Sequence, residues 1–287
     1  MTYSELESRV IESLISQYGK AESRSIQRFL FECFTGIEPA AYLLIRQNEA
    51  GEEFKERVLH AISQLVECVP VQYVTGVSWF CGFKFKVTPG VLIPRPETEE
   101  LVTKIVQKYS RKQGLKVLDI GTGSGAIAIS LDLMLNQAVV TAIDISPVAL
   151  EIAGENAASN KSGVSVFETD ILSRAAWDRF GKFDLIVSNP PYVKLSEKSL
   201  MRRNVLDYEP ETALFVSDED PLLFYRAIAE FAFRHLEAGG ELWFEINESQ
   251  GSDLSVLLIS TGFEIIQIYP DFSNKPRMLS ASQPVKN

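Results

Sequence analysis

Short apolar runs alternate with longer segments of helical periodicity from Leu115 to the end of the chain. This alternation favours one sheet of mainly parallel strands with helices on both faces, because parallel neighbours need crossover connections. The seven predicted strands are Leu115–Asp119, Ala138–Ile143, Val164–Glu168, Phe183–Ser188, Glu241–Glu245, Phe263–Tyr269 and Met278–Ala281. The main predicted helices are Gly125–Leu135, Pro147–Asn160, Leu222–Leu236 and Glu248–Ser260. The sequence therefore predicts a doubly wound α/β domain, which with one preceding helix occupies residues 97–287.

Residues 1–69 have a different pattern. Their apolar residues recur at helical spacing, and Gly19, Gly36 and Gly51 divide the stretch into about four helices. The stretch contains no catalytic constellation. We therefore expect a small helical domain whose role is to dock a macromolecular substrate.

Residues 70–96 connect the two predicted domains. Two β-like runs, Val77–Phe80 and Phe83–Val87, surround Cys81-Gly82 and predict a hairpin. A stretch stiffened by two prolines, Pro94 and Pro96, then leads into the first helix of the α/β domain. We expect the hairpin and this link to set the geometry between the two domains.

The overall composition limits the classes of function. A net charge of −10 over 287 residues argues against duplex nucleic acid as the main partner, since its binding relies on cationic contacts to phosphate. No apolar run reaches the roughly 18 residues that span a bilayer, and no basic region precedes an apolar one at the N-terminus. We therefore expect a cytoplasmic protein, monomeric, with no membrane contact and no stable nucleic-acid binding.

The few cysteines and histidines do not predict a metal site. Cys33, Cys68 and Cys81 are scattered and odd in number, which is typical of reduced residues in a cytosolic protein. His60 and His235, the only histidines, lie far apart. Neither a histidine zinc site nor a Ser-His-Asp triad is supported, and no metal is predicted.

The most specific local feature is the end of the strand Phe183–Ser188, which runs into Asn189-Pro190-Pro191-Tyr192. Two prolines end a strand abruptly, because neither can donate to a ladder. The rigid turn offers the Asn189 carboxamide and the Pro190 carbonyl as acceptors, with the Tyr192 ring behind them. Such a turn can hold a planar amine or amide, although a strand terminator without chemistry would show the same residues.

A glycine-rich turn, Gly121-Thr122-Gly123-Ser124-Gly125, joins the first predicted strand to a helix. Glycines allow a tight turn and close approach of a ligand to the backbone. Asp144 ends the next strand, where a carboxylate can accept from both ribose hydroxyls. Asp170 ends the third strand, in a position to accept from an adenine amino group. This pattern predicts a nucleoside pocket.

The glycine pattern fits both a dinucleotide and S-adenosylmethionine. A carboxylate at Asp119, directly before the glycines, would repel a pyrophosphate but would suit the ammonium and sulfonium charges of S-adenosylmethionine. A dinucleotide enzyme has no evident need for the turn that begins at Asn189. The sequence therefore favours S-adenosylmethionine.

With these features in place, nearly the whole chain resembles the release factor glutamine methyltransferases, a family of class I S-adenosylmethionine-dependent methyltransferases with a Rossmann-like fold. The motifs that carry the resemblance are Leu92-Ile93-Pro94-Arg95-Pro96-Glu97-Thr98-Glu99, Asp119–Gly125, Asn189-Pro190-Pro191-Tyr192 and Tyr208-Glu209-Pro210-Glu211-Thr212-Ala213-Leu214. The Asn-Pro-Pro-Tyr motif alone is shared with adenine-specific DNA methyltransferases; its combination with the other motifs makes the resemblance specific.

The resemblance implies that the substrate is the glutamine side chain of the Gly-Gly-Gln motif in peptide chain release factors. The implied cofactor-binding residues are Gly121, Thr122, Gly123, Ser124, Gly125, Asp144, Asp170, Ile171 and Asn189. The implied catalytic residues are Asn189, Pro190 and Tyr192, and the implied substrate-binding residues are Asn189, Pro190, Pro191 and Tyr192. Electrostatics and proximity would carry catalysis, because a methylated amide sheds its proton without a strong base.

The chain departs from the family pattern at two positions. Asn247 and Asn274 stand where the family usually has glycine. Asparagine tolerates positive φ better than other non-glycine residues, so we expect both turns to survive. An adenine-specific nucleic-acid methyltransferase, another amide or amine methyltransferase and a non-catalytic binding module remain as alternative functions.

Overall fold

A computed structural model describes residues 1–285 of the chain. Two compact units are present. One consists of Met1–Val77 and Arg202–Tyr208, and the other of Ser78–Met201 and the chain from Glu209 onward. The domain limits predicted at residues 69 and 96 stay a prediction.

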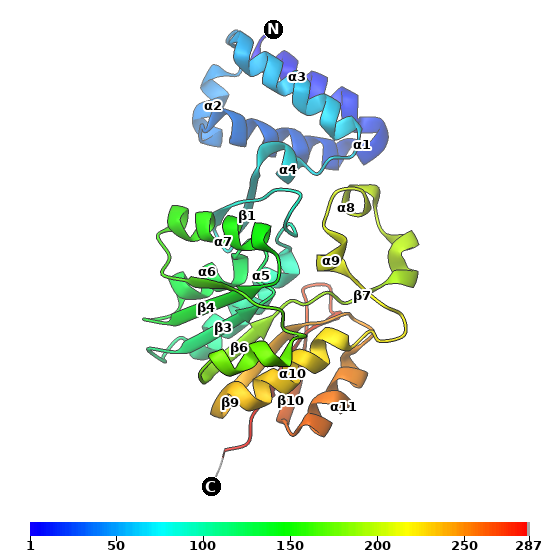
Figure 1. The fold of residues 1–287 in the computed structure, drawn as a ribbon. Helices are drawn as coiled ribbons and strands as arrows, with labels where there is room; N and C mark the ends of the chain where they lie inside the picture. Colours follow the sequence, from blue (N-terminus) through cyan, green and yellow to red (C-terminus); the bar gives the residue numbers. More distant parts are fainter. Residues whose placement is uncertain (286–287) are drawn as a thin grey trace. The chain divides into compact units, whose positions relative to one another are not determined.

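The larger unit is built on a seven-stranded sheet with the strand order β10-β11-β9-β6-β3-β4-β5 (Figure 1). Its strands are β3 (Lys116–Ile120), β4 (Val139–Asp144), β5 (Ser165–Glu168), β6 (Phe183–Ser188), β9 (Leu236–Glu245), β10 (Glu264–Pro270) and β11 (Pro276–Ser282). Neighbours from β9 to β5 pair in parallel. The predicted seven-stranded, mainly parallel sheet is confirmed, although β9 begins earlier than predicted, at Leu236.

Helices cover both faces of this sheet (Figure 1). They are α5 (Pro96–Tyr109), α6 (Ala126–Met134), α7 (Pro147–Asn160), α10 (Leu223–His235) and α11 (Gly251–Thr261). Successive strand residues point to opposite faces, so Val117 packs with α5 and α6 while Leu118 packs with α10 and α11. Both residues are fully buried. The resulting three-layer arrangement is the predicted doubly wound fold.

The strand β11 distinguishes this sheet from that of a dinucleotide-binding domain. It runs antiparallel to both of its neighbours, β9 and β10. The common dinucleotide-binding sheet places its fifth and sixth strands side by side, without an intervening antiparallel strand. The topology therefore counts against the dinucleotide interpretation of the glycine turn.

The smaller unit is helical, as predicted. Its elements are α1 (Tyr3–Thr35), α2 (Pro39–Ile45), α3 (Glu52–Val66), α4 (Val71–Thr75) and α8 (Arg203–Leu206). Apolar residues of α1 and α3, among them Leu14, Leu30 and Leu65, form its core. Gly19 does not end a helix; it kinks α1, with φ of 72° and ψ of 168°.

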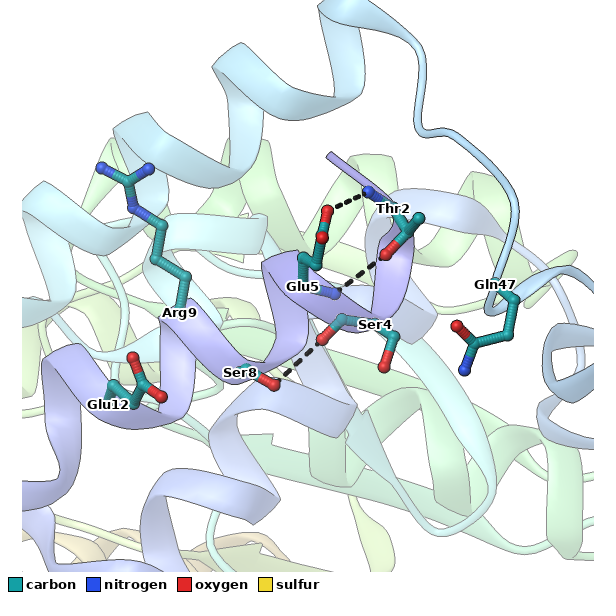
Figure 2. A pocket seen from close by; sticks show the side chains of 7 residues that line it. All are labelled: Thr2, Ser4, Glu5, Ser8, Arg9, Glu12 and Gln47. Carbon is teal, nitrogen blue, oxygen red and sulfur yellow. Dashed lines mark hydrogen bonds between the residues drawn. The ribbon is translucent and has the colours of Figure 1, made fainter.

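The first turn of α1 is closed by a capping box (Figure 2). The backbone N–H of Glu5 donates to the Thr2 hydroxyl, and the Thr2 N–H donates to the Glu5 carboxylate. These bonds satisfy backbone donors that a helix N-terminus leaves without partners. A shallow, polar hollow of ≈ 530 Å³ lies beside this turn (Figure 2). Because the capping bonds engage its Thr2 and Glu5 side chains, we assign it a structural role.

The segment Arg202–Tyr208 belongs to the helical unit, which the sequence patterns do not indicate. The Tyr208 hydroxyl donates to the main-chain oxygen of Glu67 over 2.7 Å, and Arg202 pairs with Glu22 at 3.3 Å. The long stretch after Tyr192 thus includes a part that packs with helices from the start of the chain.

The predicted hairpin is formed by β1 (Val77–Phe80) and β2 (Phe83–Lys86). Cys81 and Gly82 both have positive φ, 50° and 81°, as a two-residue type I′ turn requires. Asn156 of α7 accepts from the Lys86 N–H at 2.6 Å and donates to the main-chain oxygens of Lys86 and Ser124. The hairpin is therefore fastened to α7 and to the glycine turn.

Short elements complete the larger unit. They are η1 (Arg174–Arg179), β7 (Val193–Lys194), η2 (Leu195–Leu200), α9 (Glu211–Leu214) and β8 (Phe215–Val216). β7 and β8 pair with each other in parallel. Within residues 1–285, no helix has both the length and the apolar character that a membrane span requires.

Candidate active site

A cavity of ≈ 320 Å³ lies where the parallel strands of the larger unit end. The sequence-predicted residues that line it are Gly121, Gly123, Asp144, Asp170, Ile171, Asn189, Pro190 and Pro191. They lie at or just after the ends of β3, β4, β5 and β6, whose carboxyl ends meet at one edge of the sheet. The fold therefore brings the glycine turn and the Asn-Pro-Pro turn, far apart in sequence, to a single cavity.

The glycine turn is held against the end of β4. The backbone N–H groups of Gly121 and Thr122 both donate to the main-chain oxygen of Ile143, at 2.8 and 3.0 Å. Gly121 and Gly123 have φ of 74° and 55° and face the cavity without side chains. Thr122 is buried away from the cavity, so this side of the turn offers a ligand mainly backbone.

Two further residues of the predicted cofactor set, Ser124 and Gly125, do not line the cavity. Ser124 is buried, and Gly125 starts α6 with φ of 81°. A Cβ on Gly125 would lie 3.2 Å from that of Ala153. Gly125 therefore permits close packing of α6 on α7, which is a supporting role.

Asp144 links the glycine turn to the helix that follows β4. Its carboxylate accepts from the backbone N–H groups of Gly123 and Ser146, both at 2.9 Å. Burial raises its pKa, and these backbone donors oppose that rise. A carboxylate has about four lone-pair sites, so Asp144 can still accept from ligand hydroxyls at the cavity wall.

Asp170 and its neighbours form the next part of the wall. One Asp170 oxygen accepts from the Leu172 N–H at 2.8 Å, which fixes the turn after β5. Ile171 and Leu172 add apolar surface beside it, and Ile145 adds more from the β4 side. This part of the cavity combines an apolar slot with a carboxylate, as a purine base would need.

The expectation that Asp119 meets the charges of the cofactor is not supported by its position. Asp119 is 0% exposed, is not among the cavity-lining residues, and accepts from the Thr122 hydroxyl at 2.6 Å. It lies beneath the glycine turn, because the residue before the strand end points into the core. Burial raises its pKa from 3.8 to about 7.

The Asn-Pro-Pro-Tyr turn is fixed by three side-chain bonds. The Ser188 hydroxyl donates to the main-chain oxygen of Ile120 at 2.7 Å, which ties the ends of β6 and β3 together. The Asn189 Nδ2 donates to the Thr98 hydroxyl at 3.3 Å. The Tyr192 hydroxyl donates to Glu245 at 2.9 Å. The turn is therefore held in place before any substrate binds.

Tyr192 lies off the larger cavity. It lines a smaller one, of ≈ 50 Å³, which shares Asn189 and Pro190 with the larger cavity. Leu92, Arg95 and Glu245 also line this small cavity. Asn189 and Pro190 thus stand between the nucleoside pocket and a narrow space suited to a small planar group.

Several lining residues were not assigned a role from the sequence. Gly90, Val91 and Leu92 form part of the larger cavity's wall, and a Cβ on Gly90 would lie 2.5 Å from Val148 Cγ1. The sequence feature that could have indicated their role is the proline and glycine content around the expected link. The stretch after the hairpin is therefore part of the site.

Glu209 holds this stretch in place. It is buried and accepts from the Arg95 guanidinium at 2.5 Å and from the Ile93 N–H at 3.2 Å. Pro210, Thr212 and Ala213 follow it along the larger cavity. Two of the motifs behind the family resemblance therefore meet at this ion pair.

The two asparagines at family glycine positions behave differently. Asn274 has φ of 60°, so the expected left-handed conformation is confirmed there. Asn247 is not among the positive-φ residues of the described chain, so its turn forms without the left-handed conformation. Its side-chain oxygen instead accepts from the Ser249 N–H and hydroxyl, at 3.0 and 2.9 Å, and stabilises the turn directly.

The residues present fit S-adenosylmethionine. A cavity of ≈ 320 Å³ is within the size range of small-molecule sites. Its wall supplies bare backbone at the glycines, an apolar slot for a base, and carboxylates at Asp144 and Asp170 for hydroxyl and amino groups. Two acceptors near its far end, Asn189 and Pro190, can hold a nitrogen nucleophile.

Residues 97–206 match the family described as methyltransferase small domain, and residues 9–76 match the PrmC N-terminal domain. A methyltransferase from Pyrococcus furiosus aligns over 82% of this chain and 100% of its own, with a TM-score of 0.51 and 19% identity. The 16S rRNA N2 G1207 methyltransferase of T. thermophilus aligns with the same TM-score and identity, over 72% of this chain and 49% of its own. The fold and the site define a class I methyltransferase that uses S-adenosylmethionine.

Two curated relatives are far more similar in sequence. The release factor glutamine methyltransferase of Bacteroides thetaiotaomicron is 47% identical over 80% of this chain and 82% of its own. The release factor glutamine methyltransferase of Flavobacterium psychrophilum is 40% identical over 95% of this chain and 96% of its own. The chain belongs to the release factor glutamine methyltransferase family.

We predict that Asp144→Ala weakens S-adenosylmethionine binding by about 1.5–3 kcal/mol, the range for loss of a charge-assisted hydrogen bond. Titration calorimetry measures this directly. Asp132→Ala is the matched control, because Asp132 also accepts from a backbone N–H, that of Gly163, but does not line the cavity. Equal affinity of the parent and the Asp144 variant would remove Asp144 from the cofactor site.

A second prediction concerns Asp119 and pH. The pKa of Asp119 is about 7 in the folded protein and near 3.8 in the unfolded chain, so the folded protein binds the proton more tightly. This proton binding stabilises the fold fully below about pH 4, and the stabilisation is lost as the pH rises towards 7. Asp119→Asn removes the dependence. Relative to this variant, the parent's free energy of unfolding should fall by up to about 1.4 kcal/mol per pH unit in that window. Urea unfolding at several pH values tests this, and parallel curves would contradict it.

Proposed function

We propose that this enzyme transfers a methyl group from S-adenosylmethionine to the side-chain amide nitrogen of the glutamine in the Gly-Gly-Gln motif of peptide chain release factors. The family membership names the substrate class. The observation that supports the chemistry most is the position of Asn189 and Pro190, which line both the nucleoside pocket and the narrow cavity beside it.

The acceptors of the turn explain how an unreactive nitrogen could be methylated. An amide nitrogen is a poor nucleophile because its lone pair is delocalised into the carbonyl. When bound, S-adenosylmethionine supplies an electrophilic methyl group. We propose that Asn189 Oδ1 and the Pro190 carbonyl oxygen each accept a hydrogen bond from one of the two N–H groups of the glutamine amide. They then stabilise the positive charge that builds on nitrogen, whose proton afterwards passes to solvent.

Tyr192 has a narrower role in this proposal than in the sequence-based interpretation. Its hydroxyl donates to Glu245, and burial, followed by the charge of Glu245, raises its pKa well above the usual value. It is therefore a poor proton donor. We propose that Tyr192 shapes the narrow cavity and takes no part in proton transfer.

The alternative of an adenine-specific nucleic-acid methyltransferase is not favoured. The curated relatives carry the release factor name, and the net charge of −10 is unsuited to a phosphate backbone. A substrate used in translation is consistent with a cytoplasmic enzyme, and the proposal includes a cytoplasmic location and a monomeric state.

We further propose that the helical unit, including residues 1–69, docks the body of the release factor. Leu43 and Leu44 of α2 are 67% and 84% exposed. Beside them lies a hollow of ≈ 300 Å³ whose lining includes Phe31, Ile37 and Tyr42. Exposed apolar side chains next to a concave surface are typical of protein-binding sites.

We predict that Asn189→Ala lowers the rate of release factor methylation by about 10²-fold or more, as loss of one transition-state hydrogen bond does. Asn189→Asp keeps an acceptor oxygen and should retain part of the activity. S-adenosylmethionine affinity should change far less in either variant. Asn136→Ala is a matched control, since Asn136 is exposed and outside the cavity. Mass spectrometry of the release factor measures the product, and parent-level activity of both Asn189 variants would exclude this role.

For the docking role, Leu44→Glu should raise KM for the intact release factor severalfold, because it places a charge on the proposed contact surface. The kcat should stay close to the parent value. Val256→Glu on α11 is the control, since Val256 is likewise an exposed apolar residue, at 67%, but belongs to the other unit. An unchanged KM for Leu44→Glu would argue against docking at α2.

A further inference from the structure

A chain of buried hydrogen bonds leads from Asn189 to a carboxylate that the proposed chemistry does not use. Asn189 Nδ2 lies 3.3 Å from Thr98 Oγ1, and the Thr98 hydroxyl lies 2.5 Å from Glu245 Oε2. Thr98 is 4% exposed and Glu245 is 1% exposed. Thr98 belongs to α5 and Glu245 to the end of β9. Two elements distant in sequence therefore support the Asn189 side chain.

The hydroxyls around Glu245 indicate which way these bonds run. An ionised carboxylate only accepts, and here each of its oxygens faces a hydroxyl, Tyr192 at 2.9 Å and Thr98 at 2.5 Å. Burial raises the pKa of Glu245 above its usual value, and both hydroxyls and the charge of Arg277 oppose this rise. The short Thr98 contact is in the range of a hydroxyl donating to a carboxylate.

The Thr98 hydroxyl has a single proton, which it donates in its hydrogen bond to Glu245. Towards Asn189, Thr98 can therefore offer only a lone pair. The Asn189 carboxamide must then point its NH₂ group at Thr98, which directs Oδ1 away from Thr98. Within residues 1–285, Thr98 is the one residue whose side chain is hydrogen-bonded to the Asn189 carboxamide, so Thr98 sets this orientation.

We propose that Thr98, backed by Glu245, is a positioning residue that locks the Asn189 carboxamide with Oδ1 as the acceptor for the substrate amide. This inference rests on the proposed function. It assigns a role to Thr98, which belongs to the motif stretch Leu92–Glu99, and to Glu245 at the end of β9. Both residues lie outside the nucleoside pocket.

The locked orientation also gives the site a basis for selectivity. With Oδ1 of Asn189 and the Pro190 carbonyl as acceptors, the site favours a group that carries two N–H donors. A glutamate carboxylate has none and would face two oxygens, which repel it. An unlocked Asn189 could rotate its carboxamide and donate to such a carboxylate. Thr98 would thus help the enzyme to distinguish glutamine from glutamate.

The first test compares Thr98→Val, which keeps the shape but removes the hydroxyl, with Thr98→Ser, which keeps the hydroxyl. Thr98→Val should lower kcat for the release factor by about three- to tenfold, the effect of one neutral hydrogen bond. Thr98→Ser should restore most of the rate. S-adenosylmethionine affinity, measured by calorimetry, should match the parent in both variants.

The same substitution in the Asn189→Asp background separates positioning from general damage. A carboxylate at position 189 has two equivalent oxygens and no orientation to lock. Thr98→Val should then cause no further loss of kcat. It also removes the contact between the Thr98 oxygen and a carboxylate oxygen at position 189, which repel each other. A purely structural role of Thr98 would lower activity equally in both backgrounds, and that result would overturn the proposal.

A binding measurement provides a readout that does not depend on turnover. A release factor with glutamate in place of the Gly-Gly-Gln glutamine should compete poorly with the natural factor for the parent enzyme. It should compete about three- to tenfold better for Thr98→Val, where the carboxamide can rotate. Equal competition in both enzymes would contradict the selectivity argument.

Neutron diffraction from the parent protein decides the orientation without any variant, even if Thr98→Val fails to fold. Two deuterons on the Asn189 atom that faces Thr98 support the proposal, and their absence there overturns it. If Asn189→Ala keeps the parent rate, the proposed function of the turn fails together with this inference. If Asn189→Ala is inactive but Thr98→Val equals the parent, only the inference fails.

Discussion

The active site depends on one buried carboxylate, Glu245. A charge removed from water is tolerated only where donors surround it, because the desolvation cost of an unpaired carboxylate is several kcal/mol. Thr98 and Tyr192 provide those donors, from the start of α5 and from the turn after β6. The Tyr225 hydroxyl of α10 donates to the main-chain oxygen of the same residue. The need to satisfy Glu245 therefore fixes the relative positions of three elements that line or support the cavity.

The cofactor side of the cavity follows a similar principle with backbone groups. Gly121 and Thr122 donate to the end of β4, while Asp144 accepts from the glycine turn and from the start of α7. Each bond pairs a group that the strand ends would otherwise leave unsatisfied. The pocket is consequently formed before ligand binding, so little binding energy is lost in ordering it. Asn156 extends this order to the hairpin through Lys86 and Ser124.

Preorganisation matters for this chemistry because the nucleophile is weak. An amide nitrogen gains little from a general base, so the enzyme must act through position and electrostatics. In the proposed mechanism, acceptors held by prolines and by a hydrogen-bonded carboxamide lose little entropy when the transition state forms. The rigid turn at Asn189 and Pro190 is thus better suited to the reaction than a flexible loop with the same atoms would be.

The sequence by itself determined the strands, the helices and the residues of the two turns, because periodicity, glycine and proline act locally. It placed Asp144, Asp170 and Asn189 correctly at strand ends, and the parallel topology then implied a shared edge. Only the tertiary structure decided what each side chain contacts. Asp119 is buried beneath its turn, Gly90 forms part of the wall, and residues 202–208 pack with helices from the start of the chain. The contact between Thr98 and Glu245 joins residues 147 positions apart, and no local pattern encodes such a pairing because it arises from how α5 packs on the completed sheet.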